Sequence, residues 1–206
     1  MSTVFDDNAN EYDEWFAVND ELYRSELDAL QSMLDIDKTY IEVGVGTGLF
    51  ASKLGIAEGV EPCEEMANIA RRRGIVVHDA LAQHLPYEDG SIEGIMMVTV
   101  DCFVKDIKAV FDEAYRVLMP HGSYVMAFLD RSTPLGQVYE DTKADNIYYR
   151  DAIFRSADEM RELLESSGLK VIDSCESVYT LDNIYQPRKA GTGNGVFAIL
   201  KAEKEI

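Results

Sequence analysis

Three glycines at alternate positions, preceded by a carboxylate, carry the clearest chemistry in this sequence. Glu42 is followed by Gly44, Gly46 and Gly48 in the run EVGVGTG. Glycine adopts positive φ readily and lets a ligand approach the backbone without a Cβ in the way. Apolar residues before the turn predict a short strand, and those after it predict a helix whose free N–H groups point at the turn. The stretch 39–50 is therefore typical of a nucleotide-binding edge.

Two cofactors are compatible with such a turn. Residues 46–51 satisfy the G-x-G-x-x-A dinucleotide fingerprint, which is a weak signal when it stands alone. A carboxylate at Glu42 would repel the pyrophosphate of NAD, and it suits a ligand with an ammonium or sulfonium group instead. The pattern E-x-G-x-G-x-G resembles the first motif of the class I S-adenosylmethionine-dependent methyltransferases. An NAD(P)-dependent oxidoreductase is the enzyme alternative, and a non-catalytic S-adenosylmethionine-binding regulator is the alternative without catalysis.

Further residues follow in the order of this family. Glu61 ends a second apolar run and follows the turn at close to the ~20 residues expected for a carboxylate that binds ribose hydroxyls. Residues 78–92 resemble the family block that contains an aspartate and then Leu-Pro. The resemblance implies S-adenosyl-L-methionine as the cofactor and S-adenosyl-L-homocysteine as the product. By the same resemblance, the cofactor contacts are Tyr12, Glu42, Gly44, Gly46, Gly48, Glu61, Pro62, Met66, Asp79, Ala80 and Val100, with Asp79 and Ala80 on the adenine.

The N-terminal region carries aromatic and acidic residues in alternation. FDDNANEYDEWF at 5–16 resembles the N-terminal segment of the ubiquinone-biosynthesis-like methyltransferases, which implies that Tyr12 lies near the methionine end of the cofactor. Plain packing of these rings on the domain is the alternative. Apolar residues at helical spacing over 21–34 predict an amphipathic helix that serves only the core. We expect residues 1–36 to form helices that cover the cofactor.

The acceptor side is expected where the central strand ends. The continuously apolar run 95–100 predicts a strand covered on both faces. Ligands in open α/β sheets bind beyond the carboxyl ends of the strands, so Asp101 and Cys102 are expected to face the methyl acceptor. Asp101 is the first weak candidate for a general base, and His84 is the second.

A polar stretch, 131–155, is expected to form an insertion on the substrate side. Within it, Tyr148 and Tyr149 either line the acceptor pocket or pack as a structural edge. No spacing of His, Asp or Glu indicates a metal site. The acceptor itself is not identified by any pattern.

Helical and extended patterns alternate through most of the chain. They predict one domain over 1–206, an α/β three-layer Rossmann-like sandwich with a mostly parallel seven-stranded sheet and an antiparallel last strand. RVLMPHG at 116–122 resembles the family's RVLkPGG turn, and His121 stands at a glycine position there. We interpret it as a structural turn histidine.

The charge balance limits the partners. Nineteen basic and 38 acidic residues give a net charge of −19, which argues against nucleic acid. Arg71, Arg72 and Arg73 are interpreted as a helix end that complements the dipole. A small-molecule acceptor is the leading expectation, and a basic protein or peptide stays open. No apolar run approaches the ~20 residues of a membrane span. The absence of a signal-peptide pattern and of C-x-x-C pairs predicts a cytoplasmic protein, whose oligomeric state stays open.

Overall fold

The computed structural model describes residues 4–205, and the side chains of residue 9 and of 11–205. Phe5, which belongs to the aromatic N-terminal pattern, lies outside the described side chains. The helices run over α1 Val4–Val18, α2 Asp20–Gln31, α3 Leu49–Leu54, α4 Glu64–Arg72, α5 Ile107–Val117, α6 Pro134–Thr142 and α7 Ala157–Ser166. Two short 3-10 helices, η1 Asp101–Phe103 and η2 Lys143–Asp145, join these elements.

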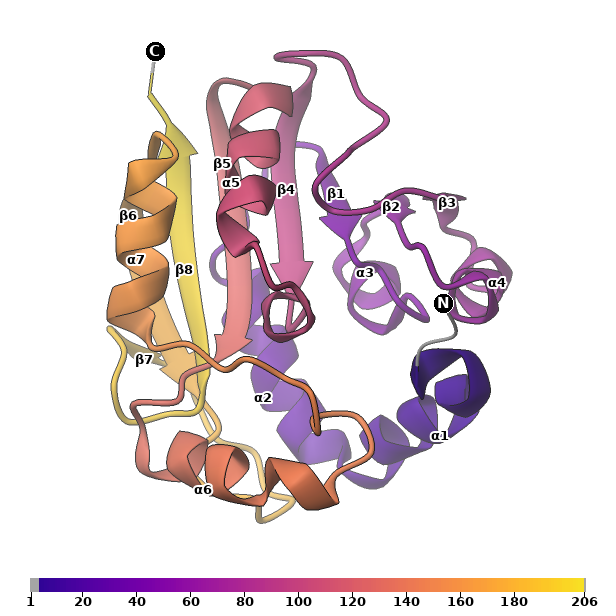
Figure 1. The fold of residues 1–206 in the computed structure, drawn as a ribbon, viewed down its shortest axis with the longest axis vertical. Helices are drawn as coiled ribbons and strands as arrows, with labels where there is room; N and C mark the ends of the chain where they lie inside the picture. Colours follow the sequence, from indigo (N-terminus) through magenta and orange to yellow (C-terminus); the bar gives the residue numbers. More distant parts are fainter. Residues whose placement is uncertain (1–3, 206) are drawn as a thin grey trace.

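One sheet forms the middle of the molecule (Figure 1), in the strand order β3-β2-β1-β4-β5-β8-β6-β7. Its strands are β1 Tyr40–Val43, β2 Glu58–Val60, β3 Val76–His78, β4 Ile92–Val98, β5 Leu118–Leu129, β6 Leu169–Ser177, β7 Lys189–Ala190 and β8 Phe197–Lys204. The first five strands are parallel, whereas β8 runs antiparallel to both β5 and β6.

The expected mostly parallel sheet and its antiparallel last strand are confirmed, but the number of strands is corrected. The described part of the chain has eight strands rather than seven. The additional strand, β7, contains two residues and pairs with the edge of β6. A strand this short carries no alternation of apolar and polar residues, so no periodicity could indicate it.

Helices cover both faces of the sheet and make it the middle of three layers (Figure 1). One core cluster joins α2 and α3 to one face through Leu30, Phe50 and Val125. The other cluster joins α5 and α7 to the opposite face through Phe111, Met160 and Tyr124. No helix among the described residues is both long and apolar enough to cross a bilayer.

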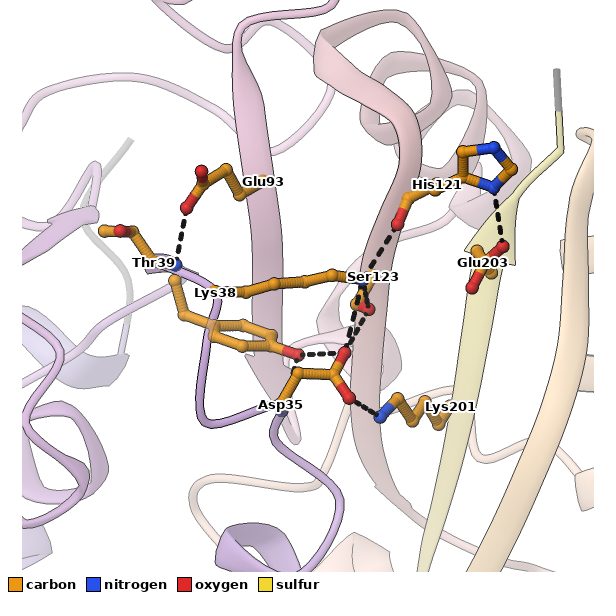
Figure 2. Close-up of polar contacts among 9 residues, drawn as sticks. Asp35, Lys38, Thr39, Glu93, His121, Ser123, Lys201 and Glu203 are labelled. Atoms are coloured by element: carbon orange, nitrogen blue, oxygen red, sulfur yellow. Dashed lines mark hydrogen bonds and ion pairs between the residues drawn. The ribbon is translucent and has the colours of Figure 1, made fainter.

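A polar cluster closes the end of the sheet where β1 begins (Figure 2). Ser123 of β5 donates a hydrogen bond of 2.6 Å to the carboxylate of Asp35, and the Lys201 ammonium of β8 pairs with the same carboxylate. The Lys38 ammonium lies 3.3 Å from it, and the Tyr40 hydroxyl donates to it at 3.3 Å. We call these five residues the Asp35 cluster. It ties the α2–β1 connection to two distant strands.

Candidate cofactor and acceptor site

The glycine turn between β1 and α3 leaves room for a ligand at only one of its three glycines. Gly44, Gly46 and Gly48 all have positive φ, at 74°, 54° and 79°. A Cβ on Gly44 would lie 2.3 Å from Val100, and one on Gly48 would lie 2.4 Å from Ile75. At Gly46 the nearest atom to such a Cβ, the Met66 methyl group, is 3.6 Å away. Protein side chains therefore block a Cβ at Gly44 and Gly48, whereas a Cβ on Gly46 would make only an ordinary contact.

Glu61 holds the turn in this conformation. One oxygen of its carboxylate accepts a hydrogen bond from the Gly46 N–H at 2.9 Å, and the other accepts from the Cys63 N–H at 2.9 Å. A carboxylate oxygen has more than one acceptor position, so these bonds leave capacity for ligand hydroxyls. Glu61 and Gly46 both line the cavity that opens above the turn.

Glu42 lies underneath the turn and not on the cavity wall. Its side chain is 2% exposed, and Oε2 has no partner in the described part of the chain. Burial raises the pKa of this carboxyl well above its usual value, against the effect of a hydrogen bond from the Ala51 backbone. The structure therefore does not bring the carboxylate to the position expected for contact with a cationic ligand. The pattern was informative about the turn, but the side chain points toward α3.

The cavity has a volume of about 1210 Å³ and runs along the carboxyl ends of the parallel strands. Pockets for a single small ligand usually measure about 300–1,000 Å³, so this one is large enough for two molecules. Ten residues expected at the site line it: Tyr12, Gly44, Gly46, Glu61, Pro62, Met66, Ala80, Val100, Tyr148 and Tyr149. Gly48, Glu42, Asp79, His84, Asp101 and Cys102 are not on its wall.

The two residues that end the central strand turn inward, contrary to expectation. Asp101 and Cys102 are 1% and 3% exposed, because the chain enters η1 directly after β4. Burial raises the pKa of Asp101 to about 7, although the charge of Arg155 opposes this shift. The neighbouring Phe103 and Val104 face the cavity instead. Neither weak base candidate lies on the cavity wall, since Asp101 is buried and His84 is exposed outside it.

Helix α1 is fastened to the glycine turn. The Thr47 hydroxyl donates a 2.6 Å hydrogen bond to Asp13 of α1. Arg73, at the end of α4, pairs with the same carboxylate at 2.6 Å and donates to the Thr47 carbonyl at 2.6 Å. The arginine cluster expected to complement the α4 dipole therefore also anchors another helix. This anchor positions Tyr12, Trp15 and Phe16 as one wall of the cavity.

Glu26 of α2 also lines the cavity, although the helix pattern predicted a purely structural role for α2. The side chain is half-buried and has no hydrogen bond or ion pair with any residue that the structure describes. Burial raises the pKa of its carboxyl to about 8. The only sequence signal is an acid beside the apolar positions of an amphipathic helix, which is equally typical of a solvated face.

Aromatic side chains from distant segments surround this part of the cavity. Tyr139 of α6 and Tyr149 pack with ring centroids 5.8 Å apart, and both line the cavity. Tyr149 also stacks on Phe103 at 6.1 Å, and Tyr12 meets Tyr148 at 6.3 Å. The tyrosine pair predicted in the insertion 131–155 is therefore on the cavity wall and in contact with the N-terminal helix.

The described residues contain no group of three or more His, Cys, Asp or Glu side chains arranged to hold a metal ion.

Known proteins resemble this chain in sequence and in fold. A family model described as a methyltransferase domain matches residues 41–126. MJ1123 of Methanocaldococcus jannaschii, described as uncharacterized, is 38% identical over 203 residues, which cover 98% of each protein. A Thermotoga maritima crystal structure is 36% identical, with a TM-score of 0.95 over 98% of this chain and 99% of that chain. It is described as an SAM-dependent methyltransferase and possible histamine N-methyltransferase.

A more distant likeness concerns the fold alone. In the complex of the Haloferax volcanii Trm112 methyltransferase activator, the matching chain is 20% identical, with a TM-score of 0.77 over 100% of both chains.

Proposed function

Because the chain belongs to the class I S-adenosylmethionine-dependent methyltransferases, we propose that it methylates a small molecule bound in the same cavity as the cofactor. The observation that carries this proposal is the continuity of the cavity. It runs from the glycine turn and Glu61 to the tyrosines of the insertion. Its volume of about 1210 Å³ exceeds what one small ligand requires.

The residues at the glycine turn fit the cofactor. The open space at Gly46 admits a ligand against the backbone, and Glu61 offers carboxylate oxygens for ribose hydroxyls. Met66 supplies an apolar wall, and Ala80 a backbone group, for the adenine ring of the cofactor. Cys63 precedes the first residue of α4, and Pro62 lies beside it on the rim of the cavity. We propose that all these residues contact the bound cofactor.

The protein's contribution is binding and alignment. When bound, the cofactor supplies a methyl group already activated by a positively charged sulfur. The cavity residues hold the acceptor in line with that methyl group, and correct orientation of two reactants can recover about 7–11 kcal/mol of the barrier. The rings of α1 and of the insertion exclude water from the meeting point.

The description of the Thermotoga relative, as a possible histamine N-methyltransferase, supports a small-molecule acceptor. A basic protein or peptide is the alternative. The tyrosine wall argues against it, because Tyr12 and Tyr148 meet across the cavity and narrow the access of a polypeptide.

Binding and transfer can be tested separately. Calorimetry should show that the protein binds S-adenosylhomocysteine and not NAD. Gly46→Val should weaken this binding at least about tenfold, since the new side chain enters the cavity. Gly55→Val is the matched control, because Gly55 also has positive φ with open space but lies outside the cavity.

Transfer is then followed with methyl-labelled cofactor and cell extract. The label is expected in the low-molecular-mass fraction, where the product can be identified. Label confined to the protein fraction would contradict the small-molecule acceptor, and failure of wild-type protein to bind the cofactor product would contradict the function itself.

A further inference from the structure

Glu26 is a carboxylate in the cavity that the proposed cofactor contacts do not use. It lies on α2 and lines the same cavity as Tyr12 of α1 and Tyr139 of α6. The described residues provide it with neither a hydrogen bond donor nor a cation. A buried or half-buried carboxylate without a partner costs free energy, so such groups are normally paired. A ligand that supplies the missing positive charge would remove this cost.

The walls around Glu26 suit an organic cation. Burial raises the pKa of the hydroxyls of Tyr12, Tyr139 and Tyr149. The negative charge of Glu26 is close enough to raise each of these pKa values further. The faces of aromatic rings attract a positively charged nitrogen, and the attraction is strongest where water is excluded. A carboxylate among several rings is thus complementary to an ammonium group and repels an anion.

Charge in the rest of the cavity has the same sign. Asp106 and Asp151 line it together with Glu26, and Lys105 is the one basic side chain on the wall among the described residues. With a net charge of −19 on the whole chain, the surrounding field also attracts cations toward the opening.

We infer that the methyl acceptor is a small organic amine that binds as a cation, with Glu26 as its ion-pair partner and the rings of Tyr12, Tyr139 and Tyr149 around its charged end. This inference rests on the proposed function and specifies its substrate class.

The chemistry of the transfer is consistent with this assignment. An ammonium group has no free electron pair, so one N–H bond must break before nitrogen attacks. The proton passes to the Glu26 carboxylate, which is the ion-pair partner of the ammonium group. The freed pair on nitrogen forms the bond to the methyl carbon, and the pair of the broken C–S bond stays on sulfur. The products are the methylated amine, which is a cation, and the neutral thioether.

Binding to the complex with S-adenosylhomocysteine tests the inference without turnover. Three probes of similar size differ in charge: 2-phenylethylamine is a cation at pH 7.5, 2-phenylethanol is neutral and phenylacetate is an anion. Calorimetry should show the amine bound most tightly and phenylacetate least. Glu26→Gln should weaken binding of the amine at least about 30-fold, as expected when one partner of a desolvated ion pair is lost. Binding of the alcohol should be nearly unchanged.

A matched control and a second variant keep the result interpretable. Glu14→Gln removes the same charge from an exposed position on α1 and should leave amine binding unchanged. Tyr139→Leu removes one ring while keeping Glu26, and should weaken amine binding about fivefold.

Two results would overturn the inference and leave the proposed function intact. One is equal binding of amine and alcohol to the wild-type complex. The other is an unchanged amine affinity in Glu26→Gln together with weaker S-adenosylhomocysteine binding, which would assign Glu26 to the amino group of the cofactor. Failure of the wild-type protein to bind S-adenosylhomocysteine would instead contradict the proposed function.

Discussion

Two carboxylates, one within α2 and one after it, show how differently the two ends of the sheet are built. Asp35 follows the helix and meets cations and hydroxyls from β5 and β8 (Figure 2). Burial opposes its ionisation, but the hydrogen bonds from Lys201 and Ser123 outweigh burial and lower its pKa from 3.8 to about 2. Glu26, inside the helix, has no such partner among the described residues, and burial raises its pKa from 4.5 to about 8.

The comparison separates a structural carboxylate from one kept for a ligand. Folding supplies every partner of Asp35, so its charge stabilises the native chain. Glu26 lowers stability in the absence of a ligand, which is the usual relation between a binding group and the fold that carries it. A change at Asp35 should therefore alter stability, and a change at Glu26 should alter ligand binding.

The largest expected effect is a loss of stability when the Asp35 cluster is disrupted. Asp35→Ala should lower the free energy of unfolding by about 2–3 kcal/mol, because Lys201, whose side chain is 14% exposed, loses its partner. Urea denaturation measures this loss, and calorimetry should show unchanged cofactor binding. Asp37→Ala in the same connection removes an exposed acid and serves as the control. If both variants lose equal stability, the Asp35 cluster has no special role.

The pH dependence of stability sharpens the same contrast. Between pH 4.5 and about 8 the folded chain holds a proton on Glu26 that the unfolded chain has lost, so stability falls as pH rises through this window. Glu26→Gln should reduce this fall by up to about 1.4 kcal/mol per pH unit. The facing groups, Tyr12, Tyr139 and Tyr149, stay protonated there because burial raises the pKa of each.

Unfolding curves measured across that range check the prediction. Asp101, with a pKa of about 7, adds a slope of the same sign to both proteins and cancels between them. Identical slopes for wild type and Glu26→Gln would show that Glu26 titrates normally. The depressed pKa of Asp35 acts in the opposite sense, since its contribution is present above pH 3.8 and is lost as pH falls through about 2.

A smaller effect is expected at the anchor of α1. Asp13→Ala removes the partner that Thr47 and Arg73 share, so α1 should dock less firmly over the glycine turn. We expect the dissociation constant of S-adenosylhomocysteine to rise about fivefold, because only part of the about 1.5–3 kcal/mol typical of a hydrogen bond to a charged group is transmitted to the cofactor site. Glu14→Ala, one position along the helix, is the control. Wild-type affinity in Asp13→Ala would mean that α1 does not contribute to the cofactor site.

The smallest effect is predicted at His121, whose carbonyl accepts a hydrogen bond from Lys38 of the Asp35 cluster. His121 has a φ of 63°, in the left-handed region that glycine adopts without strain. His121→Gly should be more stable than His121→Ala by about 0.5–1 kcal/mol, since both lose the imidazole contact with Glu203 and only alanine keeps the strain. Thermal unfolding of the pair measures the difference. A more stable alanine variant would show that the backbone is not strained here.

The sequence predicted the features that depend on local spacing. The glycine turn and the parallel strands follow patterns of a few neighbouring residues, and the structure contains both. His121 was expected in a turn at a glycine position, but the structure places it within β5, with the positive φ that glycine adopts readily. These features are fixed by backbone conformation, which short patterns encode directly.

The orientation of side chains at the site could not be predicted in the same way. Asp101 was expected to face the acceptor, but η1 turns it into the core, and no local pattern marks that turn. Glu26 was missed because its surroundings come from α1, α6 and the segment after η2, more than 100 residues away in two of these cases. Its environment exists only once the chain has folded.

The residues proposed to surround the acceptor lie on both sides of the region that the family model matches, residues 41–126. Tyr12 and Glu26 precede this region, and Tyr139 and Tyr149 follow it. A chimera that receives residues 1–36 and 131–155 from a homologue is therefore expected to gain a new substrate preference while the glycine turn is left as it was.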